Sequence, residues 1–283
     1  MLKRVCALIS VLTFVVLVGC GAPETTPTTA PTSGGGDKKP DVKKDTPPKK
    51  GASTAEKFPA DKATGSIKGV VTLEGEAPKM NKIDMSGAAA CAALHKDAVT
   101  KEDVVAKDGK LANVVVYVTT VNGKPIADTW SFDPATEEAT IDQKGCQYIP
   151  HVLAVTCDQP VNVQSDDDLA HNIHYIGNNP EFNESQQKAG SKKAVKFSEP
   201  DEHAAIACNI HGWMKAYLWV FPHKLFAVTK EDGSYEIKGV PAGDYEVAVW
   251  QESEGLKLTK LDAVKVKVGD KEAKEQNFTY KVK

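Results

Sequence analysis

Arginine is almost absent from this chain of 283 residues: Arg4 is the only one, although lysine is abundant. Arginine is the side chain best suited to bidentate contacts with phosphate groups and guanine bases. The formal net charge is −3, so the chain also lacks the basic surplus typical of proteins that bind nucleic acids. We therefore expect no nucleic-acid partner.

The common motifs of cofactor binding and catalysis are missing as well. The sequence contains no C-x-x-C-H segment, which excludes covalently attached c-type haem. It also contains no P-loop, no G-x-S-x-G segment and no H-E-x-x-H segment, each of which marks a well-known class of enzyme.

The N-terminal segment has the pattern of a signal peptide. Lys3 and Arg4 precede an apolar run over residues 5–18, which is too short to span a membrane comfortably. The run ends in "LVGC", which resembles the lipobox of bacterial lipoproteins. The resemblance implies that residues 1–20 are a lipoprotein signal peptide and that Cys20 becomes the acylated N-terminus. The protein would then be lipid-anchored to a bacterial membrane in the cell envelope, facing the periplasm or the exterior, where disulfides persist. A plain signal peptide or a short anchor is the alternative.

Residues 21–64 are dominated by Pro, Thr, Gly, Lys and Asp, with few apolar side chains. Such a composition buries too little surface to offset the entropy lost on ordering. We expect a disordered linker between the membrane and the folded part.

Residues 65–283 indicate an all-β fold. Apolar and β-branched segments of five to eight residues recur, and Gly, Pro, Asn or Asp separates most of them. This spacing is typical of β-sandwiches and barrels. One short helix is predicted at 86–96, where alanine is frequent.

The segment 226–252, with its tight turns "EDGSY" and "VPAGDY", resembles the carboxypeptidase regulatory-like family, a small transthyretin-like (prealbumin-like) β-sandwich. Residues 69–78, "GVVTLEGEAP", loosely match the start of that family, and "NVVVYV" at 113–118 fits its second strand.

The resemblance implies a discontinuous β-sandwich made of residues 65–125 and 223–283, with 126–222 as an inserted domain. Insertions are tolerated where the two ends of the inserted piece lie close together. Two domains in series are the alternative.

Metal-binding side chains gather in "CNIHGWM" (208–214) and "HNIHY" (171–175). Cys208, His211 and Met214 lie three residues apart in a short loop between two apolar segments. A thiolate, two imidazoles and a weak thioether form the blue-copper arrangement, whereas structural zinc commonly takes two or more cysteines. The second imidazole must come from His171 or His174.

This pattern resembles the amicyanin-like cupredoxins over about residues 135–222, which implies a Greek-key β-sandwich. The resemblance implies a mononuclear type 1 copper held by His171, Cys208, His211 and Met214. It also implies that Asn172 ties the two ligand loops together and hydrogen-bonds near the sulfur of the cysteine. His174 is the alternative first ligand, although strand alternation aims it to the opposite side from His171.

Once Cys6, Cys20 and Cys208 are assigned, Cys91, Cys146 and Cys157 remain, and the sequence alone allows three pairings. The block "DQKGCQYIPHV" resembles one found in lipoproteins that combine these two domains, and an upstream cysteine accompanies it there. The resemblance implies a Cys91–Cys146 disulfide; Cys146–Cys157 is the rival.

These features predict a membrane-anchored type 1 copper protein that carries single electrons to or from a redox protein partner. A copper-storage or sensing module, or an adhesion lipoprotein with a structural cupredoxin domain, are the alternatives. We do not expect an enzyme, because His95, His151, His203 and His223 are scattered and form no second copper cluster.

Overall fold

The structure is a computed structural model that describes residues 55–283, and these lie in one compact unit. The predicted signal peptide, the acylation of Cys20 and most of the predicted linker lie outside the described residues. Within residues 55–283, no helix is both long and apolar enough to cross a membrane.

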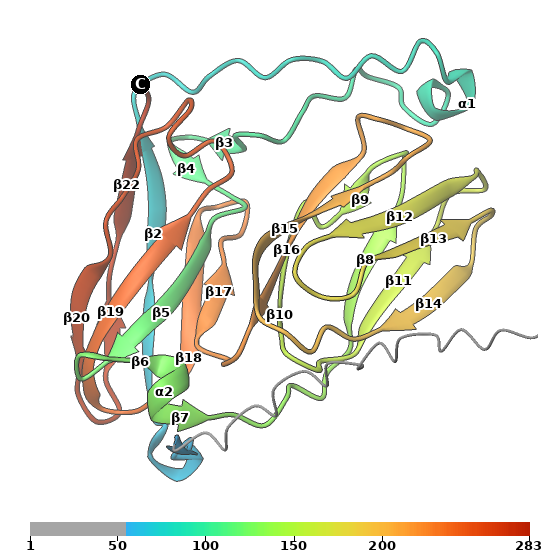
Figure 1. The fold of residues 1–283 in the computed structure, drawn as a ribbon. Helices are drawn as coiled ribbons and strands as arrows, with labels where there is room; N and C mark the ends of the chain where they lie inside the picture. Colours follow the sequence, from blue (N-terminus) through green and yellow to red (C-terminus); the bar gives the residue numbers. More distant parts are fainter. Residues whose placement is uncertain (1–54) are drawn as a thin grey trace, which may run out of the picture. The chain divides into compact units, whose positions relative to one another are not determined.

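Strands form nearly all of the regular structure, which confirms the all-β prediction (Figure 1). The segments rich in β-branched and aromatic residues become strands because such side chains pack well on a pleated, half-buried surface. In the part of the chain that the structure describes, the helices are three short ones: η1 (Ala60–Lys62), α1 (Ala89–Ala92) and α2 (Ile126–Thr129).

Two sheets, here called the inserted sheets, are built from the middle of the chain. The five-stranded sheet has the order β10 (Val152–Thr156), β16 (Lys215–Phe221), β15 (Asp201–Ala207), β12 (His171–Ile176) and β13 (Phe182–Gln186). The four-stranded sheet has the order β14 (Ser191–Val195), β11 (Val161–Ser165), β8 (Ala139–Gln143) and β9 (Tyr148–Ile149). Their inward side chains, among them Ile141, Val163, Ile173, Ile206 and Leu218, form one hydrophobic core.

Two further sheets, here called the flanking sheets, combine strands from both ends of the described chain. One contains β17 (Phe226–Val228), β5 (Val115–Val121), β19 (Gly243–Trp250) and β20 (Val264–Val268), with β6 (Lys124–Pro125) paired to β5. The other contains β18 (Ser234–Val240), β2 (Gly65–Glu74), β4 (Lys110–Leu111) and β3 (Ala106–Lys107), with β21 (Ala273–Glu275) and β22 (Phe278–Lys281) paired to β2. They enclose a second core.

The folded part begins earlier than the sequence predicted. The linker was expected to extend over residues 21–64, but β1 (Glu56–Lys57) pairs with β7 (Trp130–Ser131). Phe58 is buried, with its ring stacked on Phe132 and edge-on to Trp130. A single aromatic side chain with a partner 70 residues away anchors this segment, and composition alone does not reveal such a partner.

The borders between the two pairs of sheets also differ from the predicted ones. Ile126 and Trp130, placed in the inserted piece by the sequence, pack on the core of the flanking sheets. Conversely, the segment 83–99, which follows β2, packs on the core of the inserted sheets. We call this segment the crossing segment (Figure 1).

The crossing segment contains α1, which is shorter than the predicted helix at 86–96. Cys91 is the buried residue of α1, and a helix this short has little stability of its own. Tertiary contacts therefore hold the segment, including the packing of Ile83, Met85 and Val99 on the core of the inserted sheets.

The two pairs of sheets meet in a third apolar cluster. Val152, Trp219 and Phe221 come from β10 and β16, and they pack with Val115 of β5 and Trp250 of β19. Beside this cluster, His151 lies 2.7 Å from the Glu252 carboxylate. The strands β10 and β16, which reach this cluster, are paired with each other in the five-stranded sheet. The cluster therefore holds one end of that sheet, and the candidate metal ligands lie at the other end.

Candidate metal centre

Backbone pairing brings the two predicted ligand segments together. His171 begins β12, which pairs antiparallel with β15 in a register that sets His174 opposite Ala207. Cys208 directly follows β15, so it lies beside the start of β12. The chain then turns back, because Ala207 pairs with Lys215 at the start of β16.

The loop between β15 and β16 is closed by its own backbone. The Cys208 N–H bonds to the Met214 carbonyl at 3.3 Å, and the Met214 N–H bonds to the His211 carbonyl at 2.9 Å. The His211 N–H donates to the Cys208 sulfur at 3.4 Å. This tight turn places Cys208, His211 and Met214 within one loop, with Cys208 and Met214 buried.

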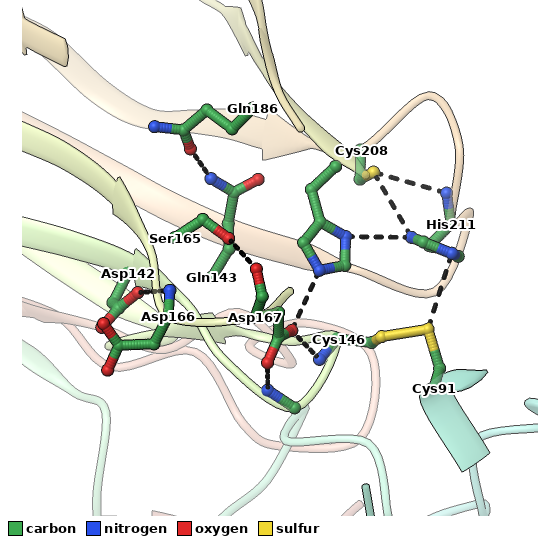
Figure 2. Close-up of polar contacts among 12 residues, drawn as sticks. Cys91, Asp142, Gln143, Cys146, Ser165, Asp166, Asp167, Gln186, Cys208 and His211 are labelled. Carbon is green, nitrogen blue, oxygen red and sulfur yellow. Dashed lines mark hydrogen bonds and ion pairs between the residues drawn. A yellow bond between two sulfur atoms is a disulfide. The ribbon is translucent and has the colours of Figure 1, made fainter. Parts of the chain in front are cut away.

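Three ligand atoms converge. The Nδ1 atoms of His171 and His211 are 3.1 Å apart, and the Cys208 Sγ lies 3.9 Å from His211 Nδ1. One ligand atom from each of these residues lies within 4.8 Å of the others. The fourth predicted ligand, Met214, is buried in the same core as Cys208. Figure 2 shows Cys208 and His211 facing each other across the loop.

Asn172 joins the two ligand segments. Its Oδ1 accepts the Asn209 N–H at 2.7 Å and lies 3.4 Å from the Cys208 Sγ. Its Nδ2 donates to Asn183 on β13 at 2.6 Å. The side chain therefore holds the start of the loop against β12 and places a polar contact on the sulfur.

Asp167 holds His171 from the other side, and no motif in the sequence marks it as a site residue. This carboxylate is 6% exposed. It accepts three hydrogen bonds, from His171 Nε2 at 2.9 Å and from the N–H groups of Gly145 and Cys146 at 2.7 Å each. Because Asp167 holds Nε2, Nδ1 is the ring nitrogen that faces Cys208 and His211 and would bind a metal. Asp167 is the third residue of the polar run "SDDDL" (165–169), and only the fold directs it inward to His171.

A disulfide borders the site. Cys91 of α1 is bonded to Cys146, with their Cα atoms 5.7 Å apart. The Cys91 Sγ lies 3.5 Å from His211 Nε2, the nitrogen that faces away from Cys208 (Figure 2). The indole N–H of Trp213 donates to the Cys146 carbonyl at 3.1 Å, and its ring packs 5.1 Å from that of His211. Cys157 takes no part in the disulfide.

The protonation of the three groups follows from these contacts. Burial alone raises the pKa of Cys208, but hydrogen bonds from His171 and from backbone groups outweigh it and leave the pKa lowered. Burial lowers the pKa of His171, yet its bonds to Cys208 and Asp167 leave the pKa raised. Burial and the nearby His171 lower the pKa of His211. These contacts thus make it easier for Cys208 to lose its proton, which metal binding requires.

The other histidines lie elsewhere. His174 faces away from the three converging atoms and contacts Asn209 and Glu181. His95 bonds to the Gly145 carbonyl, His151 bonds to Glu252, and His203 stacks on Trp250. His223 is buried against Phe221.

The donor set fits copper better than structural zinc. Cys91 and Cys146, the other cysteines beside His211, are joined in a disulfide, so the site offers one thiolate. One thiolate, two imidazoles and a thioether suit copper, whereas structural zinc favours four strong ligands, commonly with several cysteines.

The sequence matches no protein-family model and no curated protein. Several solved structures are similar to part of the chain. A copper-containing nitrite reductase from Thermus scotoductus is 19% identical, with 37% of this chain and 25% of that chain covered and a TM-score of 0.28. A variant of amicyanin in its reduced Cu(I) form is 18% identical, with 30% and 84% covered and a TM-score of 0.28.

A purple cupredoxin from Nitrosopumilus maritimus is 23% identical, with 29% of this chain and 98% of that chain covered and a TM-score of 0.26. The chain thus spans about a quarter of the nitrite reductase. At these identities and TM-scores, the function has to be inferred from the residues of the site itself.

Proposed function

We propose that His171, Cys208, His211 and Met214 hold a single type 1 copper ion and that the protein is a one-electron carrier. The observation that carries the proposal is the convergence of two imidazole Nδ1 atoms on one buried sulfur. Copper bound there would supply a centre that alternates between Cu(II) and Cu(I).

The chain's own residues favour electron transfer over catalysis. Four protein ligands leave no open position for a substrate. His171, Cys208 and Met214 are buried, which keeps water from the centre. Asp167 and Asn172 fix His171 and Cys208 from outside, so that both oxidation states meet the same ligand geometry and little reorganisation accompanies each transfer.

The same proposal includes the setting of the domain. Acylation of Cys20 would tether the carrier to a bacterial membrane in the cell envelope, within reach of a redox protein partner. The flanking sheets, with β2 and β5 from one side of the insertion and β18 and β19 from the other, support a discontinuous carboxypeptidase regulatory-like domain. Mass spectrometry of the protein from its native membrane tests the acylation.

Optical and EPR spectra of the purified copper-loaded protein test the copper site. We expect an intense blue colour in the oxidised protein, reversible bleaching on reduction and one copper per chain. Cys208→Ser removes the thiolate and should abolish the colour, whereas Cys157→Ser, which alters a cysteine outside the site, should keep it. A colour that survives in Cys208→Ser refutes the site, and fast copper loss with slow electron exchange favours copper storage instead.

A further inference from the structure

The Cys91–Cys146 disulfide places two more sulfurs beside the imidazole ring of His211, on the side away from Cys208. His211 turns Nδ1 toward Cys208 and His171, while Nε2 lies 3.5 Å from the Cys91 Sγ. Cys91, Cys146 and His211 each offer a ligand atom within 4.8 Å of the others. His211 thus stands between two groups of soft ligands (Figure 2).

Contacts other than the S–S bond hold the two cysteines in place. The Cys146 N–H donates to Asp167, and the Cys146 carbonyl accepts the indole N–H of Trp213. The preceding Gly145 is held by Asp167 and by His95. Cys91 is fixed by the packing of the crossing segment on the core of the inserted sheets. Both sulfurs would therefore remain beside His211 after the S–S bond is cleaved.

We propose that reduction of the disulfide creates a second copper site, in which Cu(I) is bound by Cys91, Cys146 and Nε2 of His211. Two thiolates and one imidazole form a soft, three-coordinate donor set of the kind that selects Cu(I). A dithiol reductant supplies the two electrons and two protons: its thiols are oxidised to a disulfide, and Cys91 and Cys146 become thiols. Each thiol releases its proton to solvent as it binds the metal.

The shared imidazole links this site to the first. A neutral imidazole offers one lone pair, so His211 serves one of the two sites at a time. Copper arriving as Cu(I) would be captured by the thiols and held one ring away from Cys208. Re-oxidation of the two thiols by a disulfide oxidant would remove two of its three ligands and leave the first site as the stronger one. The second site thus acts as an entry site for copper.

The reductant gains access through the crossing segment. Cys91 and Cys146 are 1% and 0% exposed, so the S–S bond is shielded in the closed structure. The α1 helix has four residues and only Cys91 is buried among them. Leu94, two residues after α1, is half exposed. The short α1 turn can therefore open locally at low cost, while Ile83, Met85 and Val99 keep the rest of the crossing segment packed on the core.

A Cu(I) titration of the full mature chain with the Cys208→Ser substitution tests the proposal, because this variant lacks the thiolate of the first site. The protein is reduced with dithiothreitol, freed of the reductant without oxygen and titrated against bathocuproine disulfonate. We expect one tightly bound Cu(I) in the reduced variant, held at least 100-fold more tightly than in the same variant with its disulfide intact. X-ray absorption should show two sulfurs and one nitrogen around the metal.

The matched control carries Cys91→Ser and Cys146→Ser in addition and should bind no more tightly than the unreduced variant. His211→Ala in the Cys208→Ser background should weaken Cu(I) binding at least tenfold. The proposal is overturned if the reduced variant binds no better than the matched control, or no better than it does in denaturing urea. Cu(I) binding by Cys91, Cys146 and His211 is tested independently of the blue colour, because failure of the first site in the unsubstituted protein leaves this result unchanged; only the role as an entry site rests on the proposed function.

Discussion

The carboxylate of Asp167 offers the sharpest test of how the fold builds the site. Asp167→Asn keeps the shape but replaces one acceptor oxygen by an NH₂ group. Oδ2 accepts from both His171 and Cys146, and Oδ1 accepts from Gly145. In the better amide orientation one buried N–H loses its acceptor and faces another donor, which costs about 1–3 kcal/mol.

We therefore expect Asp167→Asn to lower the free energy of unfolding of the metal-free protein by about 2 kcal/mol, and Asp167→Ala, which abandons all three donors, to lower it by about 4 kcal/mol. Copper affinity should fall roughly 10–100-fold, because His171 is then no longer held with its proton on Nε2. Urea unfolding and copper competition measure the two effects.

The neighbouring Asp166 provides the control. Its side chain is 45% exposed and pairs with Lys144 at the surface, so Asp166→Asn should change stability by less than about 0.5 kcal/mol. If Asp167→Asn matched Asp166→Asn in both stability and copper affinity, the role given to the buried carboxylate would be wrong.

Three further predictions concern stability. Replacing both Cys91 and Cys146 by Ser opens a loop of sequence separation 55 and should cost about 4 kcal/mol in urea unfolding; a loss below about 1 kcal/mol would show that the crossing segment is held without the bond. Burial lowers the pKa of His223 to about 4. The unfolded chain takes up this proton below pH 6.5 and the folded chain does not, so stability should fall by about 3 kcal/mol from pH 6.5 to 4; His223→Gln should lack that share, and an unchanged pH profile would contradict the assignment. Trp219 is 1% exposed between the two pairs of sheets, so Trp219→Ala should lower the free energy of unfolding by about 3–5 kcal/mol. Trp219→Phe should lower it far less, because the buried indole N–H has no partner among the described residues. Equal losses for the two variants in calorimetry would refute this packing argument.

The local sequence pattern predicted the structure where residues close together in the chain determine it. The alternation in "HNIHYI" sets His171, Ile173 and Tyr175 inward and leaves His174 only partly buried, as strand geometry requires. The spacing of Cys208, His211 and Met214 likewise predicted one loop, because a turn between paired strands needs only local residues.

Contacts between residues far apart in the sequence could not be predicted from local pattern. Phe58 sits in a segment whose composition predicts disorder, yet its aromatic partners Trp130 and Phe132 come from over 70 residues later. The crossing segment joins the core of the inserted sheets although its neighbours in sequence belong to the flanking ones. Composition describes the average character of a stretch of sequence. A single buried ring or disulfide can hold a stretch in the fold even when its average composition predicts disorder.

The sequence by itself determined the β character of the folded part and the set of metal-binding side chains, since both follow from periodicity and from donor chemistry at short spacing. Only the tertiary structure decided that Asp167 turns inward to His171 and that the Cys91–Cys146 disulfide rests against His211. These contacts join residues up to 120 positions apart. They depend on the register of paired strands and on the path of the crossing segment, which no local pattern encodes.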